Sequence, residues 1–437
     1  MLGWACAAPI HAAQVESGVG LSLLHNSNIA RVETNPQSEW TEALIVGLSF
    51  RENTADLTAN VLAQMERRHF VRNTFSDDSS GFVDGAAIWT ILPRRLTWSI
   101  EDTYRQVLLD ITAQDTPTNR AKSNSLNTGP DFTFPLSSTN SAVIGGRFGR
   151  FDIENSNNDN KRYKAYARGL HALSAQTKVS LNFEATRVLF EPGAQPYPEV
   201  LRRDWFGRFE NLSATNSAVL DLGTSKVTQY GGQDLDRGRI ARLALSEAFS
   251  SESTVRLSLS NEFSDTFSDL VAGVGGSTAP REGGVVTAAS DLYHSRRGDL
   301  GYLNKGGQFE YALQVNGRRV DFATLDQQDY HERGGTFSLV WLYSGAMRFT
   351  ASAAYVRRTF DNIRIIDSNG EDKGNREDKD RNLGAQLTYR LNRNVTIRME
   401  AGRAERQSAV TLGSFVDRRV LLLLGYSSGF YEVQSRR

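Results

Sequence analysis

The stretch "NRNVTIRMEAGRAE", residues Asn392–Glu405, alternates apolar and polar side chains. Val395, Ile397 and Met399 are apolar, and the residues between them are Thr, Arg and Glu. A helix would spread the apolar groups around its circumference, whereas a β-strand places all of them on one face. The stretch therefore predicts a strand whose two faces meet different surroundings.

The same period of two recurs along the chain. It is found in "KVSLNFEATR" (178–187), "TVRLSLSNEF" (254–263) and "QFEYALQVNGR" (308–318), in which almost every second residue is apolar. No convincing stretch longer than about ten residues has the 3.6-residue period of an amphipathic helix. The pattern predicts an all-β protein.

Short and long polar connections alternate between the expected strands. The short ones include "LPRRL" (92–96) and "LNRNV" (391–395), which have the length of hairpin turns. The long ones include "DITAQDTPTNRAKSN" (110–124) and "DSNGEDKGNREDKDR" (367–381). Short turns at one end and long loops at the other are typical of a transmembrane antiparallel up-and-down β-barrel. We expect about 18–20 strands, with short periplasmic turns, long extracellular loops and both termini on the short-turn side.

Composition agrees with a barrel in the outer membrane of a Gram-negative bacterium. Only 39% of the 437 residues are apolar, and the sequence has no run of about 18 apolar residues. A barrel strand needs only about 9–11 alternating residues to cross the bilayer. Fifty basic and fifty acidic residues cancel, so bulk charge does not suggest a nucleic-acid partner. The expected partners are outer-membrane lipid and the barrel-assembly machinery that inserts such proteins.

The N-terminal segment differs from the rest of the chain. Residues 1–13, "MLGWACAAPIHAA", are apolar and end in small residues, and they contain Cys6, the only cysteine. This composition is typical of the remnant of a secretory signal peptide, with a disordered N-terminus as the alternative. Residues 14–437 are then expected to form a single barrel domain.

Parity along the strands predicts which side chains face the lumen. These lumen-lining candidates are Arg105, Arg256, Arg318, Arg348, Arg390 and Arg398 together with Glu101, Glu184, Glu262, Glu310 and Glu400. Mixed-sign charges in a pore could hold an anionic or polyhydroxylated chain weakly as it passes. Alternatively, they pair across strands and stiffen the wall without selecting a solute.

Aromatic residues cluster beside the short turns. Trp89, Trp98, Trp341, Tyr343 and Tyr389 occupy such positions. Trp and Tyr are enriched where a membrane protein crosses the lipid–water interface, so these five predict an interfacial girdle. The alternative is the general preference of aromatic residues for strands.

Other kinds of site have weak support. The carboxylates within Glu371–Arg381 suit calcium by type, but Lys373, Arg376 and Lys379 offset them and their spacing favours a solvated loop. No "GxSxG" or "HExxH" is present, and His69 near Glu66 is a weak acid–base pair. We therefore expect no catalytic residues, no metal and no cofactor.

Several segments resemble outer-membrane barrels found with exopolysaccharide biosynthesis systems, including those associated with PEP-CTERM sorting. The resemblance is carried by "FSDTFSD" (263–269), "YHSRRGDLGYL" (293–303) and turns such as Ser250–Thr254. It implies a porin-like protein that assists passage of a polysaccharide, with the polysaccharide and periplasmic export components as partners. A structural or adhesion barrel with a plugged lumen and an outer-membrane hydrolase are the other hypotheses.

Overall fold

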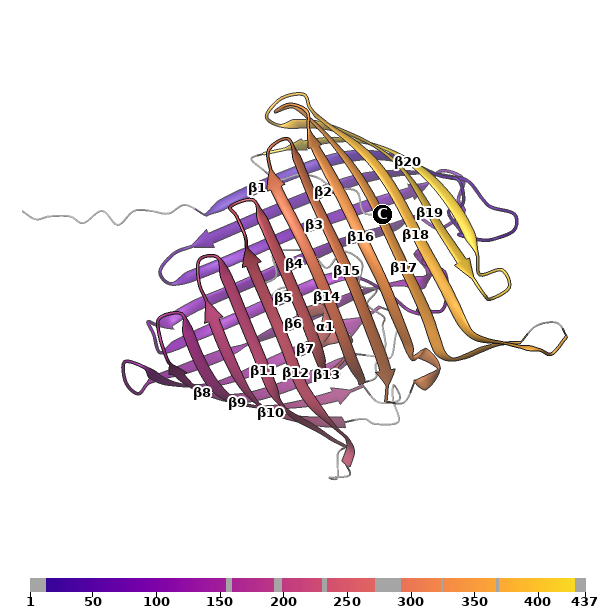
Figure 1. Cartoon of the computed structure of the whole chain (residues 1–437). Helices are drawn as coiled ribbons and strands as arrows, with labels where there is room; N and C mark the ends of the chain where they lie inside the picture. The colour runs from indigo at the N-terminus through magenta and orange to yellow at the C-terminus, as the bar shows by residue number, and fades with distance from the viewer. Residues whose placement is uncertain are drawn as a thin grey trace, which may run out of the picture.

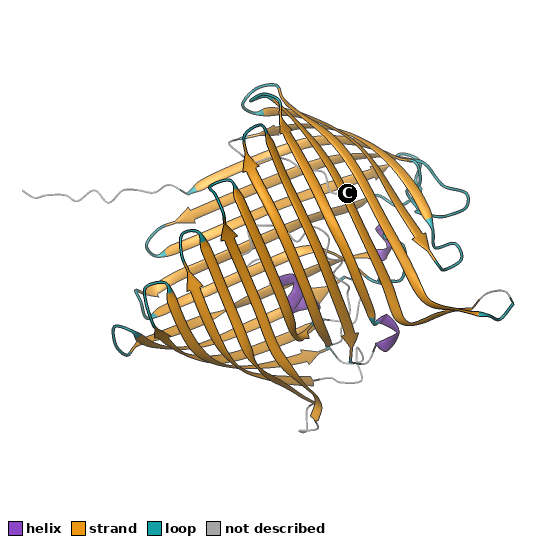
Figure 2. Ribbon diagram, in the orientation of Figure 1, coloured by secondary structure: helices purple, strands orange, loops and turns teal. Residues whose placement is uncertain are grey.

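The computed structural model describes residues 13–154, 159–191, 199–229, 234–271, 292–323, 325–366 and 369–428. Twenty strands form one antiparallel sheet that curls into a barrel (Figures 1 and 2). The strands are β1 Gln14–Asn26, β2 Glu39–Asn53, β3 Leu57–Phe70, β4 Asp78–Leu92, β5 Leu96–Leu108, β6 Arg120–Pro135, β7 Asn140–Ile153, β8 Asn160–Ala172, β9 Thr177–Phe190, β10 Glu199–Leu212, β11 Asn216–Gln229, β12 Asp234–Ala248, β13 Ser253–Ser264, β14 Tyr293–Gly306, β15 Phe309–Phe322, β16 Tyr330–Leu342, β17 Met347–Ile366, β18 Asp372–Arg390, β19 Val395–Ser408 and β20 Phe415–Ser427. The helical segments are α1 (Thr266–Val271) and two 3₁₀ turns, η1 (Pro117–Asn119) and η2 (Asp326–Gln328).

The barrel is closed by the first and last strands. β1 pairs with β20 from Gly18 opposite Ser427 to Asn26 opposite Arg419, and every other strand pairs with its neighbours in sequence. Gln14 and Ser427 therefore both lie at the end of the barrel that carries the short turns. The expected fold class, the strand count and the layout of the termini are confirmed.

Most short turns share one local hydrogen-bonding device. In seven of them the first residue has a side-chain oxygen that accepts a hydrogen bond from a backbone N–H two or three residues later. These residues are Thr54, Ser137, Ser174, Ser213, Ser250, Ser344 and Asn392. Ser, Thr and Asn stabilise turns in this way, so the recurrent serine after an apolar strand end has a structural cause.

The two faces of the sheet differ sharply in exposure. In β20, Val420, Leu422 and Leu424 are 58%, 46% and 48% exposed, whereas Leu421 and Leu423 are 5% and 1% exposed. Directly opposite residues of an antiparallel pair share a face, so the registers extend this assignment around the barrel. Exposed apolar side chains cover the outside, which is the lipid-facing surface of a transmembrane barrel.

The five aromatic residues of the expected girdle lie on the outer face beside short turns. Trp89 and Trp98 are directly opposite each other across the β4–β5 turn. Trp341 stacks on Phe349, with ring centroids 5.4 Å apart, and its edge meets Tyr343. Tyr389 lies opposite Met347 at the start of the next hairpin. This is the position that an interfacial girdle requires.

The prediction that Glu371–Arg381 forms a surface loop is wrong. β18 begins at Asp372, and its charged residues pair with β17 in a hairpin that projects beyond the neighbouring strands (Figure 1). Arg357 pairs with Glu377, and Arg364 with Asp372. Alternating charges can form a ladder of cross-strand ion pairs, so a run without apolar residues still forms a strand outside the membrane.

Other expectations concern the ends of the chain. The last strand, expected at Asp417–Phe430, is β20 at Phe415–Ser427. Residues 1–12, which include most of the expected signal remnant, and residues 429–437 lie outside the described residues. The described part of the chain has no helix long and apolar enough to cross a membrane.

Replacement of neighbouring β15 residues by arginine tests the two faces. Val315 is 53% exposed on the outer face, whereas Gln314 faces the lumen opposite Thr336. We expect Val315→Arg to lower the free energy of unfolding by about 2–4 kcal/mol, because it places a charge in hydrocarbon. Gln314→Arg should have little effect. Urea unfolding in phospholipid vesicles measures both, and equal destabilisation would contradict the orientation of the barrel wall.

Candidate functional site

A segment between β5 and β6 crosses the lumen to the opposite wall. Residues 109–119 leave β5, and Ile111 is 1% exposed in an apolar cluster with Tyr293, Tyr330 and Phe360 of β14, β16 and β17. Arg376 of β18 donates a hydrogen bond to the Thr112 carbonyl at 2.7 Å. The segment is therefore anchored on strands that are far away in the sheet order.

The same segment is also held near the closing strands. The Gln114 side chain donates a hydrogen bond to the Gly413 carbonyl at 2.7 Å. Asp115 forms ion pairs with Arg31 at 3.2 Å and with Arg120 at 2.6 Å. These contacts join the β5–β6 segment to the β1–β2 and β19–β20 connections.

The second inward element is α1 with the residue that precedes it. Asp265 pairs with Arg162 of β8 at 2.8 Å, and the Arg162 guanidinium lies 4.3 Å from the centroid of the Phe267 ring. Leu270 packs with Phe267 in an apolar cluster against β5, β6 and β7. On the other side, Asp269 accepts a hydrogen bond from Tyr293 at 2.7 Å and pairs with Arg318 of β15 at 2.6 Å.

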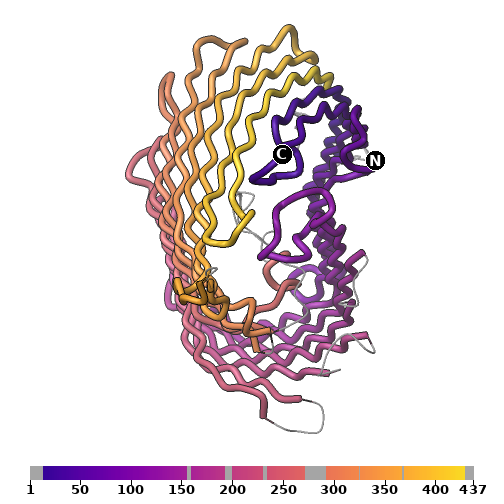
Figure 3. The backbone as a smooth tube through the Cα atoms, turned by 90° about the vertical axis from the view of Figure 1, so that its right-hand side faces the viewer, coloured from indigo at the N-terminus to yellow at the C-terminus, as the bar shows by residue number. Residues whose placement is uncertain are grey.

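Residues 109–119 and 265–271 are together called the lumenal bridge below. Both lie inside the ring of strands in Figure 3. A cavity of about 590 Å³ lies beside β7–β15, and a smaller one of about 80 Å³ lies beside β1–β3, β19 and β20. α1 borders the larger cavity, and Asp115, Thr116 and Pro117 border the smaller one.

The inner wall changes character along the barrel axis. Near the bridge it carries buried ion pairs such as Arg358–Glu332 and Arg376–Asp378, both at 2.8 Å. Toward the short turns the inward positions are mostly small and polar. Examples are Thr336, Ser338, Thr350, Ser352 and Gln386. The inner wall thus has mostly polar positions toward the short turns, and the bridge, its apolar clusters and the ion pairs crowd the extracellular half of the lumen.

The registers place all eleven lumen-lining candidates on the inner face. Six have charged or polar partners in the structure: Arg105–Asp84 2.5 Å, Glu101–Asn127 3.1 Å, Glu184–Lys164 2.7 Å, Glu262–Arg242 2.7 Å, Arg318–Asp269 2.6 Å and Glu400–Arg419 3.8 Å. Arg398 lies directly opposite Thr388 in the β18–β19 ladder. The other four face inward near short turns: Arg256, Glu310, Arg348 and Arg390. Cross-strand pairing is therefore observed for several of them, and contact with a passing solute stays a prediction.

Of the residues that hold the bridge, Arg318, which pairs with Asp269, was among the candidates, but several others were not. Arg162 and Asp265 are examples, and so is Asp115. Parity places Arg162 on the inner face, but it does not reveal that the β13–β14 connection folds back onto it. The segment "FSDTFSD" (263–269), which contains Asp265, was singled out in the sequence only because it carries a family resemblance. It gave no indication that Asp265 anchors the bridge.

Two minor site hypotheses change with the structure. His69 and Glu66 do not form a pair, because they lie on opposite faces of β3, and His69 instead contacts Asp77 at 2.9 Å. Within the ranges that the structure describes, no group of three or more His, Cys, Asp or Glu residues is arranged to hold a metal ion. The carboxylates of Glu371 and Glu377 are in ion pairs with lysines.

Two carboxylates of the bridge are ionised by their arginine partners. Burial raises the pKa of Asp115, but the neighbouring Arg120 and Arg31 outweigh it and hold the pKa below the usual value. Burial likewise raises the pKa of Asp265, and Arg162, the Ser268 N–H and Arg202 outweigh it, so this pKa is also lowered. Both anchors are therefore charged at neutral pH.

The closed sheet and its apolar outer surface require lipid around the barrel, because no other environment matches a wall of exposed leucines, valines and aromatic residues. The chain is a barrel of a Gram-negative outer membrane. No protein-family model and no curated protein matches the sequence.

Solved barrels resemble it in fold. The ferric enterobactin receptor PfeA of Pseudomonas aeruginosa, in complex with BCV-L6, is 10% identical, with 94% of this chain and 81% of that chain covered and a TM-score of 0.48. The FrpB iron transporter of Neisseria meningitidis is 8% identical, with coverage of 94% and 82% and a TM-score of 0.44. The outer membrane protein opdK of Pseudomonas aeruginosa is 9% identical, with coverage of 95% and 99% and a TM-score of 0.39.

We expect acidification below about pH 4 to detach the lumenal bridge from the barrel wall. A change of pH between 8 and 5 should leave the bridge in place. Because the folded-state pKa values of Asp115 and Asp265 are lowered, their ion pairs stabilise the bridge fully above about pH 4 and lose this contribution as the pH falls further. A nitroxide at the exposed position Ala113, introduced as Ala113→Cys with Cys6→Ser, reports the mobility of the bridge by EPR. We expect an immobile spectrum from pH 8 to 5 and a mobile one below about pH 4. Mobilisation between pH 6 and 7 would assign the anchoring to histidines.

Proposed function

We propose that the barrel is a channel for a hydrophilic solute and that the lumenal bridge is its constriction. The observation that carries this proposal is the polar inner wall, with inward Thr, Ser and Gln side chains toward the short turns and charged pairs around the bridge. A solute with many hydroxyl groups can exchange its water for such a wall at low cost. The mechanism is passage without covalent chemistry.

Within this proposal, the solute is a polysaccharide or a related polyhydroxylated molecule. The support is the resemblance of "FSDTFSD" and "YHSRRGDLGYL" to barrels of exopolysaccharide systems, together with the arginines on the inner wall. Arg256 and Arg390 are exposed inside the barrel near the short turns, where a chain arriving from the periplasm would meet them first. Guanidinium groups bind carboxylates and hydroxyl oxygens through several parallel hydrogen bonds.

A second candidate function is a structural or adhesion barrel with a plugged lumen. The bridge favours it, because Ile111 and Phe267 are packed into apolar clusters on the barrel wall. The long β17–β18 hairpin supplies a projecting surface for an extracellular partner. In this case the wild-type lumen does not conduct.

Release of the bridge distinguishes the two functions. Ile111→Ser with Asp115→Asn removes an apolar contact and an ion-pair centre without shortening the chain. For a constricted channel, we expect stepwise conductance in planar bilayers from the wild type and at least about twofold higher conductance from the double variant. Asp77→Asn is the matched control, because it alters the exposed His69–Asp77 hydrogen bond outside the lumen.

The outcomes are separable. Conductance that appears only in the double variant supports the plugged barrel. Absence of conductance from both proteins, when heat-modifiable gel mobility shows that they are folded, contradicts the channel. Block of the wild-type current by an acidic polysaccharide and not by a neutral one would support the proposed solute and the role of the arginines.

A further inference from the structure

The barrel wall has a seam between β12 and β13. These strands pair from Ala248 opposite Thr254 up to Ala241 opposite Asn261, and there the ladder stops. β12 nevertheless continues to Asp234, and β13 continues to Ser264 while it stays paired with β14. The last hydrogen bond that the described residues show across the seam is donated by the Asn261 side chain to the Arg239 carbonyl, at 3.0 Å.

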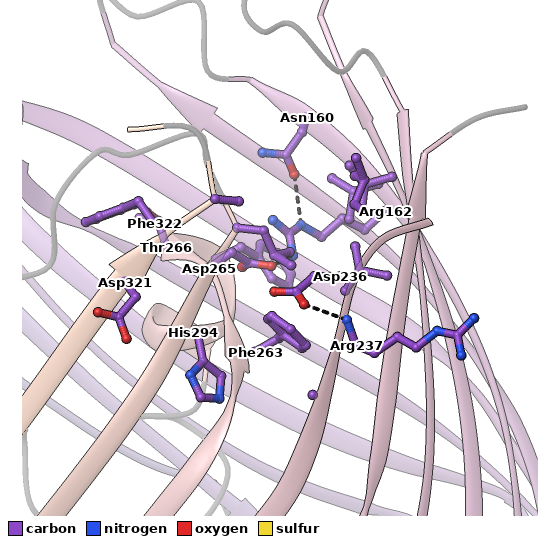
Figure 4. A pocket seen from close by; sticks show the side chains of 18 of the residues that line it. Asn160, Arg162, Asp236, Arg237, Phe263, Asp265, Thr266, His294, Asp321 and Phe322 are labelled. Carbon is purple, nitrogen blue, oxygen red and sulfur yellow. Dashed lines mark hydrogen bonds and ion pairs between the residues drawn. The ribbon is translucent and has the colours of Figure 1, made fainter. Parts of the chain in front are cut away.

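The larger cavity lies in this seam and is lined from both faces of the wall. Val200 and Val227 contribute from the inner face. Arg239 and Arg296 contribute from the outer face, where Arg296 lies beside the inward-facing Ser295 and Arg297. Figure 4 shows Phe263 between the Arg162–Asp265 pair and His294. The cavity volume of about 590 Å³ falls in the range of sites for drug-sized ligands.

Part of the cavity lining is apolar, beside the buried Arg162–Asp265 pair. Val200, Val227 and Phe263 are 5%, 2% and 6% exposed and form one cluster, with Phe190 and Leu235 packed against it. The Phe263 ring lies against Gly238 of β12, where a Cβ atom would be only 2.6 Å from the ring. The same ring lies 5.4 Å from the His294 ring, so Phe263 stands in the seam between its two sides.

The outer part of the cavity carries an excess of positive charge. Most charged groups of the lining have a partner: Arg162 pairs with Asp265, Arg237 with Asp234, and Asp321 with Arg319. Asp236 accepts a hydrogen bond from the Arg237 backbone N–H. Arg239 and Arg296 are exposed, and the described residues give neither of them an ion pair.

The height of the two arginines suits a lipid headgroup. Arg239 lies nine residues beyond Ala248, the short-turn end of β12. At about 3.3 Å per residue and a tilt of about 40°, this is about 23 Å above the periplasmic end of the strand, at the upper edge of an apolar band about 25 Å tall. A charge at this level meets headgroups, and an alkyl chain below it meets hydrocarbon.

We propose that the β12–β13 seam is a binding site for a single-chain anionic amphiphile. Its anionic group lies between Arg239 and Arg296 on the outer face, and its chain passes Phe263 into the Val200–Val227 cluster. The site joins the outer leaflet to the lumen beside α1. It does not rest on axial passage of a hydrophilic solute, because it requires only the open ladder, the apolar cluster and the two arginines.

Binding of cis-parinaric acid, a fluorescent fatty acid, tests the proposal. The full-length protein is titrated in neutral maltoside micelles, with empty micelles as the blank. We expect Arg239→Ser/Arg296→Ser to weaken binding at least about tenfold, through the loss of charge-assisted hydrogen bonds. Val227→Trp, which fills the apolar end, should weaken binding of both the acid and its methyl ester by a similar factor.

Matched controls separate the site from general effects. Arg333→Ser removes an exposed outward arginine on β16, and Leu222→Trp adds an indole on the outer face of β11. Neither should change binding. Equal affinity of the arginine variant and the wild type would overturn the headgroup assignment, and displacement of the probe by inorganic phosphate alone would overturn the amphiphile. If Arg239→Ser/Arg296→Ser and Val227→Trp lose probe binding but keep the wild-type conductance, the amphiphile site is independent of axial passage.

Discussion

A polypeptide in lipid must satisfy its backbone hydrogen bonds internally, because each unpaired N–H or C=O in hydrocarbon costs several kcal/mol. Closure of the sheet by β1 and β20 meets this requirement, and much else in the structure follows from it. Once the ladder is closed, the register fixes the face of every side chain. Four consecutive leucines, residues 421–424, therefore alternate between the inside and the lipid despite their identical chemistry.

The interior of the barrel differs from the wall because it holds buried charged groups close to the lumenal bridge. The side chains of Arg358 and Glu332 are 4% and 6% exposed, and those of Arg162 and Asp265 are 7% and 11% exposed. Desolvation offsets most of the attraction in such pairs, so they add little net stability. Loss of one partner is costly, about 3–5 kcal/mol, because it leaves an unpaired buried charge. The Arg162–Asp265 pair thus specifies where the bridge lies more than it stabilises the barrel.

The sequence predicted what depends on local periodicity. The alternation in "NRNVTIRMEAGRAE" established the strand and its two faces, and the turn at Asn392 begins where the prediction placed it. The parity of Arg105 or Glu262 was readable for the same reason. The bridge was not predictable, because Ile111 packs on Phe360, about 250 residues away in sequence and across the lumen. The charged first half of β18, residues 372–381, was missed because a charge ladder lacks the apolar alternation by which strands are detected.

The bridge and the seam have a common origin in residues 263–269. β13 cannot both continue along β12 and turn into the lumen, and the Asp265–Arg162 pair and the Phe267 contact hold it in the inward path. Among the described residues, its departure leaves the upper part of β12 without a strand partner on that side. The β12–β13 ladder is thus interrupted locally. The interruption lies at the level where headgroups and water replace hydrocarbon, so an unpaired backbone group costs less free energy there. The position of the seam follows from the constraint that closes the rest of the barrel, and Phe263 fills the gap that α1 creates.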